Sequence, residues 1–548
     1  MASVLVVSAS LGRSAVGCGS GDSVRPETWG TAAEQDAKPR PEGDAGGPTP
    51  SDSGEPAVFI GASVVQHHNH ASRDGVFVDS ALSKAAAARL ALDPTFAPQE
   101  TTGDIDAQPL YVERGPGGRE TLLVFTEANE AIALDAISGS VIWKRVLAPP
   151  AEDVPCFGVR PLGILGTPYV DLARRTIYLD SVHGTGTGTN AIAGHFVHAI
   201  SLDDGTERGP AWPLEVAKVS TPGVPFNAAY QNQRGGLALV GGVVYVAYGA
   251  HAGDCGDYRG WVIGIPVDAP GSAKGFATGD ARGCGIWGTP GVVSDGTSLF
   301  VATANGAGAD AWGQSEAVLR LRPGPSFSGL SKDFFTPSNW REMDMTLKDL
   351  GASGPILVDV PGAIPSALVA AHGKAGVAHL LDRDNLGGVA KGDGVRGEGI
   401  DSDRLQDGAI VGAPATYRTK GATYVVFQGL GYAAKCPTAD LANVVSYRVS
   451  ATSPPKIQTA WCAYDLGSGS PSVTMRDATG SDAIVWVLGT ENSNRLYGFD
   501  GETGETVFDG GSDESTQLPR VPRFAVPIAA NGRIFVASAR RPHAFRPK

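Results

Sequence analysis

The sequence predicts an all-β protein: an eight-bladed β-propeller of four-stranded antiparallel blades, with one short helix near the N-terminus. Three observations predict this fold. A strand and turn pattern recurs near both ends of the globular part, and a proline-containing marker recurs about every 60 residues between them. The chain of 548 residues also contains 74 glycines and 38 prolines, which indicates many turns.

The first pattern lies between residues 484 and 510. Ile484–Leu488 is a short apolar run rich in β-branched residues, and Arg495–Phe499 alternates polar and apolar side chains. Asp500 and Gly504 then predict a tight turn, because an Asp side chain accepts backbone hydrogen bonds and Gly adopts positive φ without strain. Three strands of one blade are therefore expected here, the last ending at Phe508.

The same pattern occurs at residues 122–143, and both copies fit small-x-Asp-x-x-Ser/Thr-Gly-x-x-x-aromatic. It resembles the pyrroloquinoline-quinone-like repeats of quinoprotein-type propellers. In that family the aromatic residue of the last strand packs between blades. The resemblance therefore implies a structural docking motif formed by Asp135, Gly139 and Trp143 in one blade, and by Asp500, Gly504 and Phe508 in another.

The second marker is a small residue, any residue and a proline, and it is expected to open the innermost strand of a blade. A strand pair follows each copy, and Gly235-Gly236 occupies the one position without proline, which makes eight units. The seven prolines are Pro109, Pro168, Pro290, Pro355, Pro414, Pro471 and Pro527.

The last unit reaches Lys548 with only three strands, so an N-terminal strand is expected to complete it. The sequence offers Ala57–Val65 or Gly75–Val78 for this strand. From Ser80, the run up to Pro94 predicts a helix over one face of the disc, because alanine has the highest helix propensity and proline stops the helix.

The N-terminus predicts export. Residues 1–18 resemble a signal peptide with a bacterial lipobox, Ala15 to Cys18, whose cysteine would carry the lipid. Residues 19–56 are rich in Gly, Pro, Ser and acidic residues and predict a disordered tether, and residues 57–548 form the propeller. We expect an envelope lipoprotein, in the outer membrane or periplasm, or a secreted protein. The alternative is a misassigned start with a free cysteine.

The net charge of −13 disfavours nucleic-acid partners, because a phosphate backbone attracts basic patches. No other segment has the roughly 20 apolar residues that span a bilayer, so contact with a membrane is expected only through the N-terminal lipid. We expect a monomer.

Five cysteines remain besides Cys18. Cys436 and Cys462 lie in one unit, and Cys255 and Cys284 flank a junction between blades, so these two pairs are the disulfide candidates. Cys156 is left without a partner. His67, His68 and His70 could suggest a metal, but their spacing supplies no fourth ligand, so polar use on an edge strand is favoured and no metal site is assigned.

Polar residues in the loops of the middle units are the candidates for ligand binding, because loops on a rigid scaffold carry function. Structural alternatives remain open: Arg234 could pair with Asp254, and Asp382 could cap a turn with Asn385. The seven candidates are Gln233, Arg234, Asp254, Tyr258, Lys374, Asp382 and Arg383.

Segments such as Ala107–Val112, Gly163–Pro168 and Tyr258–Val262 resemble secreted bacterial quinoprotein-like propellers of undetermined function, over residues 64–546. Quinone-dependent dehydrogenases of similar build carry adjacent cysteines, a calcium-binding Glu/Asn/Asp set and a catalytic Asp. This chain has no adjacent cysteines, and the acidic set cannot be placed on it.

Two functions are therefore compared. The favoured one is a non-catalytic envelope propeller that binds a protein, peptide or glycan at one face, as a similar lipoprotein of outer-membrane barrel assembly does. The alternative is an oxidoreductase with a divergent site that uses pyrroloquinoline quinone, with calcium as Lewis acid. No cofactor is assigned from the residues themselves, and fold analogy alone names no ligand.

Overall fold

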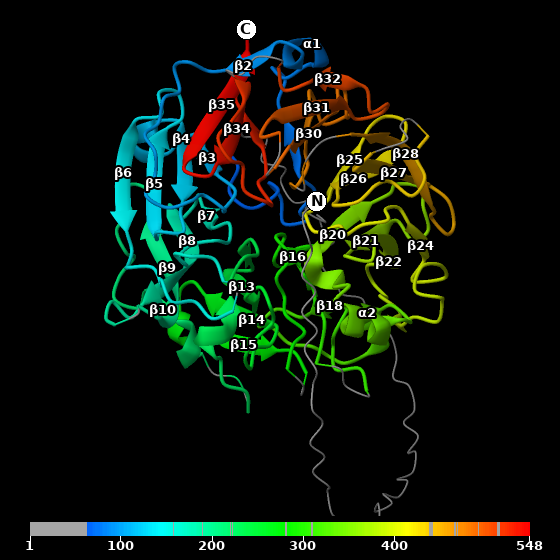
Figure 1. Cartoon of the computed structure of the whole chain (residues 1–548), viewed down its shortest axis with the longest axis horizontal. Coiled ribbons are helices and arrows are strands. Elements are labelled where there is room, and N and C mark those ends of the chain that lie inside the picture. The colour runs from blue at the N-terminus through cyan, green and yellow to red at the C-terminus, as the bar shows by residue number, and fades with distance from the viewer. Residues whose placement is uncertain are drawn as a thin grey trace, which may run out of the picture. The chain divides into compact units, whose positions relative to one another are not determined.

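The computed structural model describes residues 63–548, except residues 157, 189, 220, 222, 280–281, 308–310, 438–441, 465–466, 468, 491–492 and 512–515. In this part of the chain, eight sheets radiate around a common centre, which confirms the predicted all-β propeller (Figure 1). The predicted signal peptide, the lipid attachment at Cys18 and the tether lie outside the described residues.

Four blades come from the first half of the propeller. Blade 1 consists of β3 (Leu110–Val112), β4 (Thr121–Phe125), β5 (Glu130–Asp135) and β6 (Val141–Val146). Blade 2 consists of β7 (Tyr169–Asp171), β8 (Thr176–Gly184), β9 (Ile192–Ser201) and β10 (Leu214–Glu215). Blade 3 consists of β12 (Ala238–Val240), β13 (Val243–Ala250), β14 (Trp261–Pro266) and β15 (Lys274–Ala277), and β11 (Gln231–Asn232) also pairs with β13. Blade 4 consists of β16 (Val293–Ser294), β17 (Leu299–Ala302), β18 (Val318–Leu321) and β19 (Phe334–Thr336), with β23 (Gly388–Val389) parallel to β19.

The second half supplies the other four. Blade 5 consists of β20 (Pro355–Asp359), β21 (Ala367–His372), β22 (Val377–Asp382) and β24 (Asp401–Arg404). Blade 6 consists of β25 (Ala415–Arg418), β26 (Thr423–Gln428), β27 (Val444–Val449) and β28 (Ile457–Ala463). Blade 7 consists of β29 (Ser472–Met475), β30 (Ile484–Leu488), β31 (Leu496–Asp500) and β32 (Thr506–Phe508), with β1 (Val76–Val78) parallel to β29. Blade 8 consists of β33 (Ile528–Ala530), β34 (Arg533–Ser538), β35 (Arg541–Pro547) and β2 (Leu90–Leu92).

The ring is closed by a strand that the sequence pattern did not indicate. Blade 8 takes β2 as its fourth strand, with Leu92 opposite Phe545, next to the C-terminus (Figure 1). The two predicted closing segments are wrong: Val76–Val78 instead adds to the inner edge of blade 7, and Ala57–Val65 is described only from residue 63. The physical reason is that β35 presents an unpaired edge, which Leu90–Leu92 satisfies.

The helix predicted between Ser80 and Pro94 is shorter in the structure than expected. Only α1 (Lys84–Ala87) is helical, with the Ser83 side chain accepting a hydrogen bond from the Ala86 N–H. The rest of the alanine-rich run forms β2, because pairing with β35 and burial of Leu90 outweigh a helix propensity of a few tenths of a kcal/mol per residue. A second helix, α2 (Trp340–Thr346), was not predicted. Neither helix of the described residues is long enough to cross a membrane.

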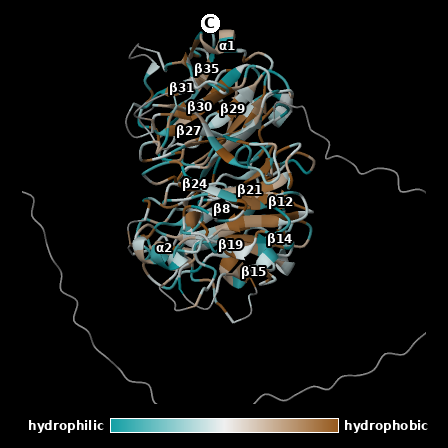
Figure 2. Ribbon diagram, turned by 90° about the vertical axis from the view of Figure 1, so that its right-hand side faces the viewer, coloured by the Kyte–Doolittle hydropathy of each residue, from teal (hydrophilic) through white to brown (hydrophobic). Residues whose placement is uncertain are grey.

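Clusters of the apolar core contain residues of neighbouring blades, and hydrophobic residues are concentrated in many of the blade strands (Figure 2). One cluster packs Tyr178 of blade 2 against Val244 of blade 3, and another packs Phe125 of blade 1 against Leu179 of blade 2. Each blade is therefore stabilised by its two neighbours, which is why closure of the ring matters.

The docking motif joins neighbouring blades. The indole N–H of Trp143 on β6 donates to the Leu202 carbonyl of blade 2 (2.9 Å), and its ring lies over Gly205, where φ is +70°. Trp461 on β28 repeats this arrangement: it donates to the Gly501 carbonyl of blade 7 (2.9 Å) and covers Gly504. Because an added Cβ at either glycine would lie under 3.0 Å from the indole ring, only glycine fits there.

The other motif residues have turn and packing roles. Asp135 and Asp500 each accept two backbone hydrogen bonds in the turn that follows, at 2.8–3.2 Å. Gly139 has positive φ beneath Pro98, and Phe508 lies 6.4 Å from the ring of Phe545 in blade 8.

Residues 64–79, which we call the axial segment, run past the innermost strands of the propeller. Val64 pairs with Tyr111 of blade 1, and Asp79 accepts a hydrogen bond from Gly532 N–H of blade 8 (2.7 Å). Between these ends, carbonyl groups of the axial segment accept hydrogen bonds of 2.8–3.0 Å from Val170, Ser294, Leu357, Thr416 and Val473, in blades 2, 4, 5, 6 and 7.

The axial segment contacts blade 3 through the side chain of Arg73, which is fully buried. Its guanidinium donates to the carbonyl groups of His67 (2.8 Å), Leu237 (2.8 Å) and Val292 (2.9 Å). The axial segment thus contacts all eight blades.

The structure changes one of the two predicted disulfides. Cys436 and Cys462 are bonded, with Cα atoms 5.9 Å apart, as the sequence predicted. Cys255, however, is bonded to Cys156 (Cα–Cα 6.1 Å), and Cys284 is buried and reduced. The predicted Cys255–Cys284 pair is wrong because blade packing brings the loop around Cys156 against the β13–β14 loop, a proximity that sequence spacing does not reveal.

Candidate functional site

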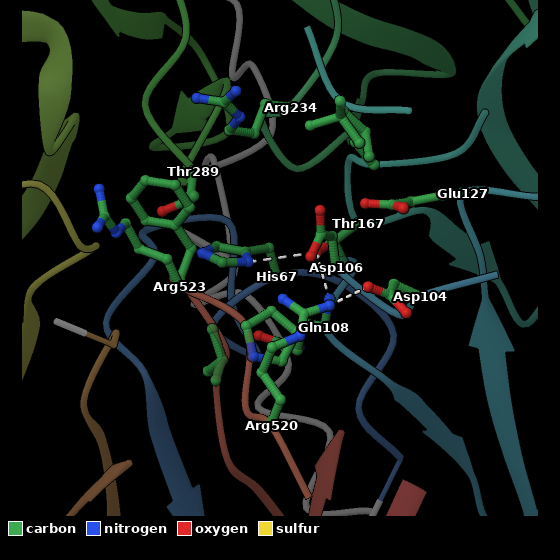
Figure 3. Close-up of a pocket in the computed structure, with 15 residues that line it drawn as sticks. His67, Asp104, Asp106, Gln108, Glu127, Thr167, Arg234, Thr289, Arg520 and Arg523 are labelled. Carbon is green, nitrogen blue, oxygen red and sulfur yellow. Dashed lines mark hydrogen bonds and ion pairs between the residues drawn. The ribbon is translucent and has the colours of Figure 1, made fainter. Parts of the chain in front are cut away.

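A cavity of about 370 Å³ lies where the segments that enter the innermost strands converge (Figure 3). We call it the axial cavity. It is lined from blades 1, 2, 3, 4 and 8 and by the axial segment, through His67. Its polar lining residues are His67, Asp104, Asp106, Gln108, Glu127, Thr167, Arg234, Thr289, Arg520 and Arg523.

A second cavity of about 680 Å³ adjoins the first, because both are lined by Arg234, Arg523 and Phe524. We call it the outer cavity. It brings together four of the predicted ligand-binding residues, Arg234, Asp254, Tyr258 and Lys374, from three different loops. It also contains the apolar or aromatic side chains Trp287, Leu347, Val411, Leu430 and Phe524.

Arg234 lies between β11 and β12, at the boundary between the two cavities. Its guanidinium carbon is 5.7 Å from the Trp287 ring centroid and 5.6 Å from that of Phe524. Within the described residues, the guanidinium makes no hydrogen bond or ion pair. Burial lowers the pKa of Arg234, and the charge of Asp106 partly opposes this effect.

The structural alternative of an ion pair between Arg234 and Asp254 is therefore not found. Asp254 instead accepts a hydrogen bond from the Tyr258 hydroxyl (3.0 Å). Both residues sit in the β13–β14 loop, which the Cys156–Cys255 bond ties down, and this local contact satisfies the carboxylate without the arginine.

Lys374 differs from Arg234 because its charge is balanced. Its ammonium group is 2.5 Å from a carboxylate oxygen of Asp349 and 5.3 Å from the Trp287 ring. Two cations thus lie near one indole ring, and in the described part of the chain only Lys374 has a carboxylate partner.

Three predicted ligand-binding residues do not line these cavities. The Gln233 side chain is buried and donates to the Gly235 carbonyl. Asp382 accepts a hydrogen bond from Asp384 N–H (2.9 Å), and its carbonyl accepts one from Asn385, which is the structural alternative of a capped turn. Arg383 pairs with Asp359 at 2.7 Å.

A pair of carboxyl groups in the axial cavity was missed by the sequence analysis. Asp106 precedes β3 and Glu127 lies between β4 and β5, and their carboxyl groups are hydrogen-bonded to each other, which requires a proton on one of them. Burial, followed by the charge of Asp106, raises the pKa of Glu127 to about 9, and burial raises the pKa of Asp106. No motif marks this pair, since blade folding alone brings the two positions together.

The histidines of the axial segment are not on an edge strand, contrary to the prediction. His67 and His68 are buried in turns with stacked rings (4.6 Å), and His70 pairs with Asp74 at 2.8 Å. His67 Nδ1 lies 3.3 Å from the Thr167 hydroxyl, whereas its Nε2 has no hydrogen-bond partner in the structure. The hydroxyl of Thr289, across the axial cavity, has none either.

The residues present do not fit the calcium and quinone set of the alternative function. Calcium takes six to eight oxygen ligands. In the described part of the chain, no group of three or more His, Cys, Asp or Glu side chains is placed to hold a metal ion. The Cys156–Cys255 bond joins residues far apart in the sequence rather than adjacent ones.

No protein-family model matches this chain, and no curated protein matches it. Several solved structures, however, are similar to it. A quinohemoprotein alcohol dehydrogenase of Pseudomonas putida HK5 has 12% sequence identity, a TM-score of 0.59, and covers 89% of this chain and 80% of its own. The quinohemoprotein alcohol dehydrogenase of Comamonas testosteroni has 13% identity and a TM-score of 0.57, with 88% and 80% coverage.

A europium-containing methanol dehydrogenase has 12% identity and a TM-score of 0.58, and covers 87% of this chain and 89% of its own. At such low identity the likeness concerns architecture and not activity. The chain therefore has the eight-bladed propeller fold of the quinoprotein alcohol and methanol dehydrogenases.

Proposed function

We propose that this protein is a binding module of the bacterial cell envelope, whose axial cavity holds a ligand through an anionic group. The observation that carries the proposal is Arg234, a partly buried guanidinium that lines both cavities and has no anionic partner among the described residues. An unpaired buried charge costs several kcal/mol, and a bound carboxylate or phosphate would offset that cost.

The surroundings of Arg234 support recognition of an anion. A guanidinium presents a planar fork that matches two oxygens of one carboxylate, and its stacking against Trp287 and Phe524 restricts its orientation. The aromatic rings leave room for an apolar part of the ligand beside the charged group. The site is held by segments that lead into strands of a closed ring, so it is preorganised.

The location of this module follows from the N-terminus and remains a proposal. Within residues 1–18, the signal peptide would be cleaved before Cys18, which would carry the lipid; residues 19–56 would act as the tether, and residues 57–548 would form the propeller. A protein, peptide or glycan that displays an acidic group would then be the partner at the propeller face.

Binding of simple carboxylates tests the proposal. Titration calorimetry of purified protein with benzoate and succinate should show saturable binding that is lost in Arg234→Gln. The matched control is Arg383→Gln, because Arg383 is also an arginine but is ion-paired with Asp359 and lies outside both cavities. Equal affinities in wild type and Arg234→Gln, or no binding of either anion, would contradict the proposal.

A separate activity assay on the same purified protein tests the quinone alternative. Pyrroloquinoline quinone with calcium is added to the protein, and alcohol oxidation with an artificial electron acceptor is followed. Turnover that depends on both additions would replace the proposed binding function by the oxidoreductase. We expect no turnover, because no calcium ligand set can be assigned within the described residues.

A further inference from the structure

The axial cavity contains two unbalanced groups of opposite sign. Arg234 carries a positive charge and has no ion pair with any described residue, whereas Asp106 and Glu127 share a hydrogen bond that requires a proton on one carboxyl. Arg234 and Asp106 influence each other electrostatically, yet no hydrogen bond or ion pair joins them. Figure 3 shows Arg234 on one side of the cavity and Glu127 on another.

The other charged residues that line the axial cavity do not balance Arg234. Asp104 forms an ion pair with Arg520, so it does not neutralise Arg234. Arg523 lines the same cavity and disfavours the charge of Arg234. Arg234, which has no anionic partner among the described residues, therefore shares a cavity of about 370 Å³ with Asp106 and Glu127, whose carboxyl groups form no ion pair with any described residue.

Two uncharged groups also lack partners there. The Thr167 hydroxyl oxygen accepts a hydrogen bond from Gln108 N–H (3.1 Å), so its own hydrogen can bond His67 Nδ1. In the tautomer in which Nδ1 accepts from Thr167, His67 Nε2 carries the ring proton and is a donor; His67 is only 2% exposed, and this atom has no partner among the described residues. Thr289, 7% exposed, has an unpaired hydroxyl. Buried polar groups are nearly always hydrogen-bonded, so these two indicate a polar ligand.

We propose that the axial cavity binds a small zwitterion, a free α-amino acid, with its carboxylate on Arg234 and His67 and its ammonium group on Asp106 and Glu127. This inference rests on the proposed anion-binding function, adds the second charge, and makes the ligand of the axial cavity a free amino acid instead of a protein, peptide or glycan. A simple anion would balance Arg234 and leave the carboxyl pair beside a new negative charge. A zwitterion balances both sides with one molecule.

The position of Arg234 at the boundary of the two cavities also indicates where the side chain of the bound amino acid lies. Because Arg234 lines both cavities, a ligand bound to it can extend into the outer cavity, past the rings of Trp287 and Phe524. The outer cavity also contains Leu347 and Leu430. An aromatic or branched apolar side chain therefore fits, and the axial cavity itself has the size of a small-ligand site.

Calorimetry with three forms of one compound tests the inference. L-phenylalanine carries both charges, N-acetyl-L-phenylalanine carries only the carboxylate, and L-phenylalaninamide carries only the ammonium group. The full-length protein should bind L-phenylalanine at least about tenfold more tightly than either derivative, since each derivative loses a charge-assisted contact. L-leucine with its two derivatives serves as a second series.

The outcomes separate the two proposals. If N-acetyl-L-phenylalanine and N-acetyl-L-leucine bind as tightly as the free amino acids, the zwitterion inference is overturned and anion binding by Arg234 stands. If neither series binds while benzoate or succinate does, the amino-acid class is likewise wrong and the anion site stands. If no carboxylate binds at all, both proposals fail.

Variants provide the second measurement. Asp106→Asn and Glu127→Gln should weaken L-phenylalanine about tenfold and leave the N-acetyl compound unchanged, whereas Arg234→Gln should weaken both. Arg383→Gln is the control, and thermal melts verify that each variant folds. Equal weakening of both compounds by Glu127→Gln and Asp106→Asn would overturn the assignment of the ammonium subsite.

Discussion

The indole N–H of Trp143 in blade 1 donates a 2.9 Å hydrogen bond to the carbonyl of Leu202 in blade 2. Trp461 makes the same bond from blade 6 to Gly501 of blade 7. A contact that recurs at separate blade junctions is a general device for joining blades, and it gives the sequence motif a physical role.

Trp143→Ala should therefore lower the free energy of unfolding by about 3–5 kcal/mol, because a buried ring is replaced by a cavity. Trp143→Phe should cost less, since it keeps part of the buried ring while losing the hydrogen bond and the rest of the indole. Val146→Ala on the same strand, where the side chain is 62% exposed, is the control. Urea unfolding checks this; a Trp143→Ala variant as stable as the control would show that the residue does not join the blades.

The axial segment should be essential for stability. Arg73→Met removes a buried guanidinium that donates to three carbonyl groups, and we expect a loss of about 3–5 kcal/mol. Arg73→Lys should not restore stability, because an ammonium group cannot reproduce the planar fork. Arg89→Met, at an exposed arginine, is the matched control. Chemical denaturation that gives equal midpoints for Arg73→Met and Arg89→Met would disprove this role.

Stability should depend on pH through the Asp106–Glu127 pair. The pKa of Glu127 is raised to about 9, so between its ordinary value and about 9 the folded protein holds a proton that the unfolded chain releases. Stability contributed by this group is therefore present at low pH and lost as pH rises through that window. Glu127→Gln should gain stability relative to wild type as pH rises from about 5.5 to about 8.5.

The control for this measurement is Glu505→Gln, at an exposed position with no partner in the axial cavity. Urea unfolding at both pH values gives the comparison. If the difference between Glu127→Gln and wild type stays constant with pH, the carboxyl pair does not share a proton in the folded protein.

The Cys156–Cys255 bond should hold the β13–β14 loop beside the outer cavity. Peptide mapping without reduction is expected to recover Cys156 linked to Cys255 and Cys436 linked to Cys462. Cys156→Ser should cost about 2–5 kcal/mol, because the bond closes a long loop. Cys284→Ser removes no disulfide and is the control. A peptide that links Cys255 to Cys284 would contradict the pairing.

Lipid attachment is expected at Cys18. Cells that express the protein and are fed a labelled fatty acid should yield labelled protein in the membrane fraction. Cys18→Ala should lose the label and become soluble, because a covalent lipid is the proposed anchor. Cys284→Ala is the matched control. An unlabelled wild-type protein would refute the lipoprotein assignment.

The sequence by itself determined the architecture. The recurring proline marker and the Asp-x-x-Ser/Thr-Gly turn are local signals, since turn chemistry depends on a few neighbouring residues. They were sufficient to count eight blades, and the resemblance of the motif to quinoprotein-type repeats implied that Trp143 packs between blades. The bond between Cys436 and Cys462 was also predictable, because both residues belong to one blade.

Only the tertiary structure decided which strand closes the ring and which side chains meet at the centre. Leu90–Leu92 has the local propensity of a helix, but the unpaired edge of β35 makes it a strand. Arg234, Asp106, Glu127 and His67 lie in separate segments with no shared motif, and radial stacking of blades brings them to one cavity. Cys156 and Cys255 meet for the same reason: long-range contacts are set by packing between blades, which local sequence patterns do not encode.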